Sequence, residues 1–327
     1  MKHENYDLAQ MQSLSLESKI IMSQQRIKVW YEYYDGEVYI AVSGGKDSQV
    51  LAHIVKKIYP DVPCVFVNTG LEYTSVVEKG NELGDVVLRP EMSFASVIKK
   101  YGYPLISKEI ALYISQMQRP QTKENEKTRN LRMNGIRSDG VKVKVGKIPE
   151  KWKFLINAPF KISHECCNVM KKRPMHKYDK TGKKPYIGTL ADESRIRMIQ
   201  WRKYGCNAFE KNRPTSQPLS FWTENDILEY AKLNNLKLAS VYGDIVGDSE
   251  LSLTGVTRTG CTFCMFGIQK DKDRFLKLKE IEPKKYDFIM NGGEFNEAGI
   301  WIPNNKGLGY KFVIDWLNKY GNMGIRY

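Results

Sequence analysis

The stretch from Val38 to Lys57 changes its hydrophobic period at a pair of glycines. Val38, Ile40 and Val42 alternate with their neighbours as residues of a buried strand do, and beyond the glycines apolar residues recur at helical spacing. Between the two patterns lies a short polar loop, Ser43-Gly44-Gly45-Lys46-Asp47-Ser48. The sequence therefore predicts a strand, a tight loop and a helix in direct succession, which is the opening of an α/β unit.

The loop has the chemistry of an anion cradle. Gly44 and Gly45 let backbone N–H groups approach a phosphate, and the helix that follows points its positive end at the same place. Ser43 and Ser48 add hydroxyl donors, and Lys46 adds a cation. The spacing of the kinase and GTPase P-loop is absent. An ordinary capped turn would explain a bare Gly-Gly-Lys, but six such residues in this order are more specific.

Composition excludes some classes of protein. The chain has 327 residues, of which 42% are hydrophobic and 27% charged, values that are ordinary for a soluble protein. That length allows one large domain with a smaller one, or two modest domains. No apolar run approaches the roughly 18 residues that a membrane span requires. The polar start Met1–Asp7 does not read as a signal peptide, so we expect a cytoplasmic protein with no membrane partner.

The charge of the chain favours a polyanionic partner. The formal net charge is +14, which suits DNA or RNA, although nucleotide enzymes are often mildly basic. Residues 119–153 are especially basic and only weakly periodic. Such a stretch is either a solvated surface insertion or a surface for a nucleic acid or another partner.

Further along the chain, strands and helices alternate. Residues up to about 35 read as an amphipathic helical segment, and a second strand at 63–67, with Cys64 in the core, ends at Asn68-Thr69-Gly70. Another strand ends at Gly188, followed by a helix whose first turn holds Asp192 and Glu193. The alternation predicts an α/β fold, a doubly wound and mostly parallel sheet whose ligand lies beyond the carboxyl ends of the strands.

Four of the six cysteines form two pairs. Cys166 and Cys167 are adjacent, and Cys261 and Cys264 form a Cys-x-x-Cys about a hundred residues later. Adjacent cysteines do not easily form a disulfide, and Cys-x-x-Cys is a common chelating turn, so four thiolates on one centre is the economical interpretation. Zinc and a [4Fe–4S] cluster both accept four thiolates, and spacing does not choose between them. Cys206 is left over as a core residue, a substitute ligand or a reactive thiol.

Several of these motifs together resemble one family. The loop is similar to the Ser-Gly-Gly-x-Asp-Ser signature of the PP-loop ATP pyrophosphatases, and the Asn68 region and Tyr186–Arg197 resemble segments of their PAPS/APS reductase (phosphoadenosine phosphosulfate reductase) family. Pro218-Leu-x-x-Trp-Thr-x-x-Asp-Ile and Val241-Tyr-Gly match in order. One arginine of the family motif is Leu190 here, so one phosphate contact must be missing or come from elsewhere.

The resemblance implies site residues and cofactors. It implies an adenine nucleotide alpha hydrolase-like fold that binds ATP, or PAPS or APS, with Mg²⁺. The nucleotide-binding residues would be Ser43, Gly44, Gly45, Lys46, Asp47, Ser48, Asn68, Thr69, Gly70, Gly188, Glu193, Ser194 and Arg197, with Lys46, Asp47 and Arg197 catalytic. The cysteine pattern looks like that of the iron–sulfur members, which implies a [4Fe–4S] cluster on Cys166, Cys167, Cys261 and Cys264 in the C-terminal region.

The resemblance also frames three hypotheses of function. The first is a DndC-like enzyme that cleaves ATP to AMP and pyrophosphate and activates a nucleic acid for sulfur insertion (DNA phosphorothioation or RNA thiolation), supplied by a donor such as a cysteine desulfurase. The second is a sulfonucleotide reductase releasing sulfite, for which only Cys206 would be available as nucleophile. The third is a non-catalytic nucleotide- and DNA-binding accessory protein. We expect a helical segment at 1–35, a nucleotide-binding domain at 36–235 and a C-terminal region at 236–327.

Overall fold

The computed structural model describes residues 4–327 and divides the chain into two compact units. Unit 1 runs from the start of the described chain to Arg89 and again from Pro174 to Gly260, whereas unit 2 comprises Pro90–Arg173 and Cys261–Tyr327. These boundaries differ from the expected segments 1–35, 36–235 and 236–327. The difference arises because 90–173 packs with the C-terminal residues, a long-range association that local patterns do not contain.

Unit 1 begins with two helices, α1 (Asn5–Gln12) and α2 (Leu16–Tyr33). The Ser15 side chain accepts a hydrogen bond from the Ser18 N–H and so caps α2. Ile27 and Trp30 of α2 are fully buried in the core of the unit. The helical character of this segment is as predicted, but it is part of unit 1 and not a separate segment.

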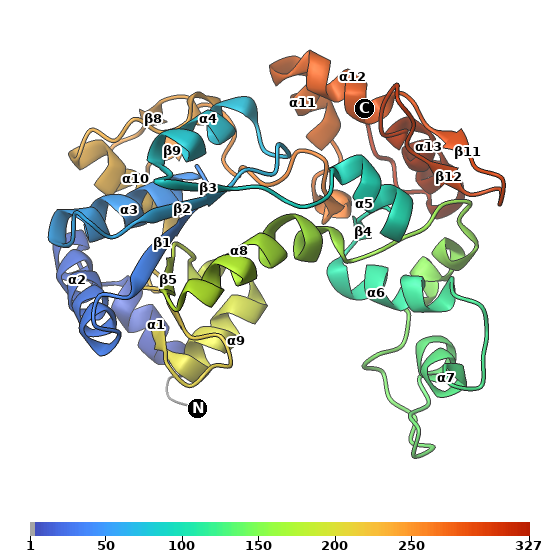
Figure 1. The fold of residues 1–327 in the computed structure, drawn as a ribbon, viewed down its shortest axis with the longest axis horizontal. Helices are drawn as coiled ribbons and strands as arrows, with labels where there is room; N and C mark the ends of the chain where they lie inside the picture. The colour runs from blue at the N-terminus through green and yellow to red at the C-terminus, as the bar shows by residue number, and fades with distance from the viewer. Residues whose placement is uncertain (1–3) are drawn as a thin grey trace. The chain divides into compact units, whose positions relative to one another are not determined.

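The centre of unit 1 is a six-stranded sheet in the order β3-β2-β1-β5-β7-β6 (Figure 1). All neighbours are parallel except β6 and β7, which run antiparallel at one edge. The prediction of a mostly parallel α/β fold is therefore confirmed. The strands are β1 (Val38–Val42), β2 (Cys64–Val67), β3 (Val86–Leu88), β5 (Lys184–Ile187), β6 (Asn207–Ala208) and β7 (Thr215–Ser216).

Helices connect and cover these strands. β1 leads through α3 to β2, and β2 leads through α4 to β3. A further short hairpin of β8 and β9 also belongs to unit 1. The bounds are α3 (Lys46–Ile58), α4 (Thr74–Leu83), α8 (Arg173–Tyr178), α9 (Arg195–Tyr204), α10 (Glu224–Leu233), β8 (Ile245–Val246) and β9 (Ser252–Leu253).

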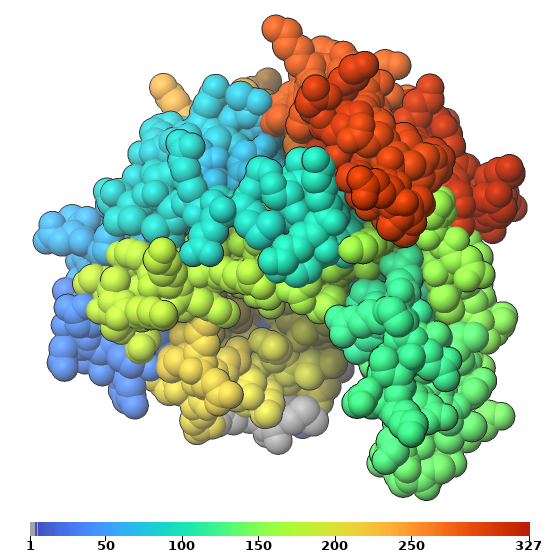
Figure 2. All heavy atoms as spheres, turned by 45° about the vertical axis from the view of Figure 1, so that its right-hand side comes forward, coloured from blue at the N-terminus to red at the C-terminus, as the bar shows by residue number. Residues whose placement is uncertain are grey.

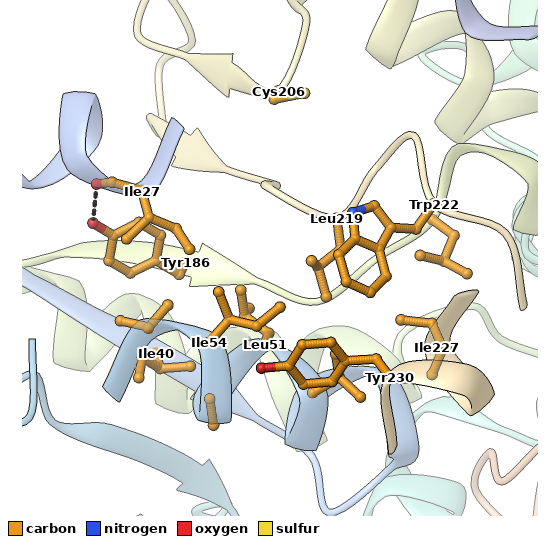
Figure 3. Close-up of a cluster of buried hydrophobic side chains, with 14 of the residues drawn as sticks. Ile27, Ile40, Leu51, Ile54, Tyr186, Cys206, Leu219, Trp222, Ile227 and Tyr230 are labelled. Carbon is orange, nitrogen blue, oxygen red and sulfur yellow. Dashed lines mark hydrogen bonds between the residues drawn. The ribbon is translucent and has the colours of Figure 1, made fainter. Parts of the chain in front are cut away.

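The core of unit 1 lies between α2, α3, α10 and one face of the sheet. Figure 3 shows Leu51 and Ile54 of α3 against Ile40 of β1, with Tyr186 of β5 beside them. The buried Tyr186 hydroxyl donates a hydrogen bond of 2.8 Å to the carbonyl oxygen of Ile27. Alternate strand residues thus supply a continuous apolar face, which fixes the register of β1 and the position of the loop that follows it.

Unit 2 is mainly helical. A short parallel pair of β4 and β10 joins its two chain segments, with Met265 opposite Leu105. Its elements are α5 (Phe94–Tyr101), β4 (Leu105–Ile106), α6 (Lys108–Met117), α7 (Glu126–Asn134), β10 (Met265–Phe266), α11 (Arg274–Ile281), α12 (Pro283–Met290), β11 (Glu294–Phe295), β12 (Trp301–Ile302) and α13 (Tyr310–Gly321).

The basic stretch 119–153 lies within unit 2 and includes α7. Its residues, turquoise to green in Figure 2, form part of the surface at the lower right. Two of its arginines form hydrogen bonds within the stretch and to α6: Arg129 donates to the carbonyl oxygens of Met117 and Arg119, and Arg132 donates to the Gly146 carbonyl and to Gln116 Oε1. The exposed cations are Arg119, Lys123, Lys127, Arg137, Lys142, Lys144 and Lys151. In the described part of the chain, no helix is long and apolar enough to span a membrane.

Candidate nucleotide site and cysteine cluster

The loop Ser43–Ser48 lies at the switch point of the sheet. It follows β1, whose neighbours are β2 on one side and β5 on the other. The connection to β2 leaves towards one edge, and the chain returns much later to form β5 towards the other. Ligands of open parallel sheets bind at such points, beyond the carboxyl ends of the strands. The structure therefore places the predicted phosphate loop where an anion can be bound by the N-terminus of α3.

Two glycines allow the chain to pack closely around this loop. Gly44 has a φ of +74°, and a Cβ there would lie 2.0 Å from the carbonyl oxygen of Val76 in α4. A Cβ at Gly188, just after β5, would lie 2.9 Å from the carbonyl oxygen of Asp47. Larger residues do not fit at these positions. The loop is consequently held between α4 and the end of β5.

Serine hydroxyls fix the shape of the loop. The Ser43 N–H donates to the Ser48 hydroxyl at 3.1 Å, and that hydroxyl donates to the Gly45 carbonyl at 2.8 Å. The Gly45 N–H in turn donates to the Ser43 hydroxyl at 3.3 Å. These bonds make Ser43 and Ser48 the residues that close the loop on itself, so the cradle is preorganised before a ligand binds.

Lys46 is buried between two carboxylates. Its ammonium lies 3.5 Å from Asp47 Oδ1 and 3.2 Å from Glu224 Oε1 at the start of α10. Burial disfavours the charged ammonium, but Asp47 and Glu224 outweigh it and hold the pKa of Lys46 above its usual value. Lys46 thus remains a cation at the loop.

Asp47 is the residue best suited to a metal ion. Burial raises the pKa of its carboxyl group above the usual value even though Lys46 lies beside it. Its Oδ1 is buried and accepts no hydrogen bond from the described residues. Among the described residues, the polar neighbour of this oxygen is the Lys46 ammonium at 3.5 Å. Such an oxygen is a ligand that Mg²⁺ accepts, because this ion prefers carboxylates together with the phosphates of a substrate. The loop therefore fits a Mg²⁺–nucleotide complex.

The segment after β5 differs from the expectation. Asp192 and Glu193 are not in the first turn of the helix, because they form a separate 3₁₀ turn, Ala191–Glu193. The helix α9 begins at Arg195, and Ser194 caps it by accepting from the Arg197 N–H at 3.3 Å. Ser194 therefore has a structural role here.

Arg197 is the cation of this segment that belongs to the site. Its guanidinium pairs with Glu193 one turn earlier. Burial lowers the pKa of Arg197, Asp47 opposes that effect, and the neighbouring cation Arg258 adds to it. Arg197 therefore lies close to the buried carboxylate of Asp47, and Arg258 is a second cation near Arg197.

The turn after β2 is held by its own side chains. Asn68 Oδ1 accepts from the Gly70 N–H at 3.1 Å, and the Thr69 hydroxyl donates to Glu72 at 2.6 Å. Gly70 has a φ of +69° with open space around its Cα. Because β2 runs parallel to β1, with Phe66 opposite Val42, this turn lies at the same edge of the sheet as the loop. These bonds do not assign a ligand to it.

Four residues of the site were not assigned a role from the sequence. They are Glu224, Arg258, Tyr242 and Thr259. Glu224 lies beside Lys46, and Arg258 lies near Arg197. The Lys46 N–H donates to the Tyr242 hydroxyl at 3.1 Å, which lies 2.6 Å from the Thr259 hydroxyl. A signal existed for two of them, because Arg258 and Thr259 are separated from the Cys-x-x-Cys by Gly260 alone. Glu224 appeared only as a residue of a helix cap.

The four predicted ligand cysteines all belong to unit 2. The sulfur atoms of Cys166 and Cys167 are 3.9 Å apart. The hydrogen bond from Cys166, together with Lys108 and Lys171, lowers the pKa of Cys167 to about 5, although burial opposes this. The same bond, burial and the nearby thiols Cys264 and Cys261 raise the pKa of Cys166. The structure thus gathers the four thiols into one neighbourhood.

The gathered thiols are not a formed metal site. Among residues 4–327, no three His, Cys, Asp or Glu side chains are arranged so that they could hold a metal ion. The donor chemistry nevertheless fits a thiolate-bound group, because four cysteines meet there and basic residues favour a thiolate at Cys167. A [4Fe–4S] cluster on Cys166, Cys167, Cys261 and Cys264 therefore stays a prediction.

The two remaining cysteines lie in unit 1. Cys64, in β2, is 1% exposed, as expected for a core residue. Cys206 is 7% exposed and packs in the cluster that includes Leu219 and Trp222 (Figure 3). Its sulfur accepts a hydrogen bond of 3.3 Å from the Ser220 hydroxyl. Of the roles left open for Cys206, the structure favours that of a core residue.

Comparisons with known proteins show what the chain is similar to. A family model described as phosphoadenosine phosphosulfate reductase domain matches residues 37–103 and 136–265. An uncharacterized protein of Methanocaldococcus jannaschii is 24% identical over 274 residues, which cover 80% of this chain and 49% of the relative. The chain thus spans about half the length of this curated relative.

A solved structure is also similar. It is the phosphoadenylyl-sulfate (PAPS) reductase from Candida auris in a phosphate complex, at 12% sequence identity and a TM-score of 0.39. The match covers 76% of this chain and 97% of that one.

Proposed function

Because the chain belongs to the phosphoadenosine phosphosulfate reductase domain family, we propose that it is an ATP pyrophosphatase that activates a nucleic acid for sulfur insertion. The observation that carries the proposal is the charge arrangement at the loop Ser43–Ser48. There Lys46 and Arg197 lie beside the buried carboxylate of Asp47, and Arg258 lies near Arg197. Such a cluster suits a triphosphate with Mg²⁺, because the cations would neutralise the phosphates and the carboxylate would bind the metal ion.

The chemistry follows from where charge develops. An oxygen of the acceptor attacks the α-phosphorus of ATP, the bond from that phosphorus to the bridging oxygen breaks, and pyrophosphate leaves with the electron pair. The acceptor oxygen then carries AMP, which is a good leaving group. A sulfur nucleophile, such as the persulfide of a cysteine desulfurase, displaces the AMP, and a thiol reductant splits the S–S bond.

Residues of the chain have distinct parts in this scheme. Lys46 and Arg197 stabilise the charge on the departing pyrophosphate, and N–H groups at the start of α3 bind phosphate oxygens. Asp47 would hold Mg²⁺, which supplies Lewis-acid stabilisation of the phosphates when bound. Glu224 keeps Lys46 charged and in position at 3.2 Å. A [4Fe–4S] cluster on the four cysteines of unit 2 would supply redox chemistry or structural support.

ATP–pyrophosphate exchange tests the proposal. Anaerobically purified protein with Mg²⁺ should exchange labelled pyrophosphate into ATP when the acceptor is present. Lys46→Met should lower the rate by about 10²–10³-fold, since it removes one charge contact to the transition state. Lys28→Met, an exposed lysine of α2, is the matched control and should leave the rate unchanged. No AMP and no exchange with DNA, RNA or candidate donors would count against the function.

Assays on the same purified protein distinguish two alternative functions. A sulfonucleotide reductase would release sulfite from PAPS or APS with thioredoxin, but the only thiol outside the cluster and β2 is Cys206, which is buried in the core of unit 1. An accessory protein would bind ATP and nucleic acid and form no AMP. Sulfite release or ATP binding without turnover would therefore replace the proposal with one of these.

A further inference from the structure

Unit 2 contains a basic cavity that the nucleotide site does not use. Its volume is about 630 Å³, within the range of roughly 300–1,000 Å³ for small-molecule sites. It lies between the end of α5, the end of α6 and the segment that leads to Cys166. The lining residues are Lys100, Tyr101, Ser115, Gln118, Arg119, Pro120, Lys161, Ile162, Ser163, His164, Glu165, Asn168 and Arg173.

The walls of the cavity are held by backbone hydrogen bonds. The Ile162 N–H donates to Gln118 Oε1 at 2.9 Å, and the Tyr103 N–H donates to the Lys161 carbonyl at 2.8 Å. Gly102 makes this approach possible, because a Cβ there would lie 2.4 Å from the Lys161 backbone. The cavity is thus part of the frame of unit 2, and its shape exists before a ligand binds.

Charge in the cavity is strongly one-sided. The lining has four permanent cations, and among the described residues none of them forms an ion pair with a carboxylate; they are Lys100, Arg119, Lys161 and Arg173. Its one carboxylate, Glu165, is already engaged by Asn168 at 2.9 Å and by His164 at 3.2 Å. Unpaired cations around a concave site favour a phosphate or another oxyanion.

Two further side chains in the lining, His164 and Tyr101, could interact with a nucleotide. His164 Nδ1 is buried and has no hydrogen-bond partner in the described chain, whereas buried polar atoms are normally paired. The Tyr101 hydroxyl interacts with Arg173 and Lys100, so its ring is held beside the cations. Aromatic rings next to cations are the usual platform for a base of a single strand.

We propose that this cavity binds a single-stranded nucleic acid, with a phosphodiester held by Lys100, Lys161 and Arg173 and a base on the ring of Tyr101. This inference rests on the proposed function, because the bound strand would be the nucleic acid into which sulfur is inserted. A concave site of this size admits an unstacked nucleotide and not a duplex. Arg119 is the first residue of the basic stretch, whose exposed Lys123 and Lys127 extend the positive charge to neighbouring phosphates.

Fluorescence anisotropy with a fluorescein-labelled oligothymidylate and the full chain, without ATP, tests the proposal. Lys161→Glu should raise Kd by about tenfold or more, and Tyr101→Ala by about tenfold. Lys99→Glu is the matched control, since Lys99 is exposed on the same helix as Lys100 but outside the lining, and should change Kd by about twofold at most. Lys161→Ala should also lower the slope of log Kd against log salt by about 0.7.

The outcomes separate this proposal from the proposed function. Equal losses in Lys161→Glu and Lys99→Glu, or an unchanged salt slope, would overturn the cavity as the strand site. Complete displacement of the strand by AMP or inorganic phosphate at matched nucleotide concentration would make it a small-anion site instead. Strand binding that depends on Lys161, with no ATP–pyrophosphate exchange under any condition, would uphold the cavity while the proposed function failed.

Discussion

Gly44 limits what the phosphate loop tolerates. Its φ is +74°, and an added Cβ would lie 2.0 Å from the Val76 carbonyl oxygen, so Gly44→Ala should lose several kcal/mol of stability and bind no ATP. Gly182→Ala is the control, because Gly182 has a φ of +94° but open space around it, and should lose about 1–2 kcal/mol. Urea unfolding and ATP titration measure both. Equal losses would mean that backbone conformation alone, and not the contact with α4, sets the cost.

Arg258 supplies a second test at this scale. The site lacks one arginine of the family pattern, at Leu190, and Arg258 is the cation that lies near Arg197. Arg258→Ala should weaken ATP binding by about 10- to 100-fold, the value of a hydrogen bond to a charged group. Arg195→Ala, an exposed residue at the start of α9, should leave the Kd for ATP unchanged. Isothermal titration with Mg²⁺–ATP measures both Kd values. An unchanged Kd in Arg258→Ala would mean that Arg258 does not replace the phosphate contact that is missing at Leu190.

Individual residues were predictable where the motif was continuous in sequence. The loop from Ser43 to Ser48 follows a strand and starts a helix, so its place at the carboxyl edge of the sheet could be predicted from periodicity and glycine content. Glu224 could not, because its contact with Lys46 joins residues far apart in the chain. The sequence of a capped helix start does not indicate which distant residue pairs with a carboxylate in its first turn, such as that of Glu224.

At the scale of elements, α10 depends on a buried ion pair. Asp226 accepts from the Thr223 N–H at 2.6 Å and closes the cap of the helix, while Lys19 of α2 donates to both of its oxygens at 2.8 and 2.7 Å. Lys19 is 2% exposed. Lys19→Met should therefore cost about 3–5 kcal/mol, because it leaves a buried carboxylate without its cation.

The control for Lys19→Met is Lys183→Met, which removes a pair with the exposed Glu37 and should cost about 1 kcal/mol or less. Urea denaturation measures both. Lys19→Met should also weaken ATP binding, since Glu224 in the first turn of the same helix positions Lys46. A loss below about 1 kcal/mol would show that Asp226 is satisfied by Thr223 alone.

Helix boundaries were predictable where a side chain caps the end. The Thr223 cap with Asp226, and the end of the first long helix before Asp35-Gly36, agree with the structure. The start of α9 was misplaced by a few residues because acidic residues favour a first turn wherever they occur. Ser194 was the better indicator of the helix start, since its hydroxyl can accept a hydrogen bond from the N–H three residues later.

At the scale of the whole molecule, the cysteines join two distant segments of unit 2. Cys166 and Cys167 come from Pro90–Arg173, and Cys261 and Cys264 from Cys261–Tyr327. If they hold [4Fe–4S], anaerobic protein should be brown with about four irons per chain. Each Cys→Ser change there should bleach it and make unit 2 sensitive to protease, because metal binding then contributes folding energy.

Cys64→Ser and Cys206→Ser are the controls for the cluster, and both should keep the colour. Absorption, iron content and limited proteolysis measure the result. Colourless protein with one zinc would replace the cluster by a structural zinc site. Loss of colour in Cys206→Ser, with colour retained in Cys166→Ser, would contradict the ligand set.

The division into units was the part of the fold that the sequence could not give. The alternation of strands and helices around β1, and with it a mostly parallel sheet, follows from hydrophobic periodicity. The pairing of Leu105 with Met265, however, joins strands of two residues each, far too short for a pattern. Only the packing of the folded chain reveals that Pro90–Arg173 belongs with the C-terminal residues.

The chain passes between the two units three times, and this determines the order in which they can be completed on a ribosome. β1 is synthesised early, but β5, its neighbour in the sheet, follows only after all of Pro90–Arg173. At the usual rate of translation, on the order of ten seconds separate β3 from β5. Until β5 has emerged, the nascent chain carries an open edge of β1, and unit 2 stays half-built until the residues after Gly260 follow. The yield of folded protein in a cell therefore depends on preventing both surfaces from associating with other chains.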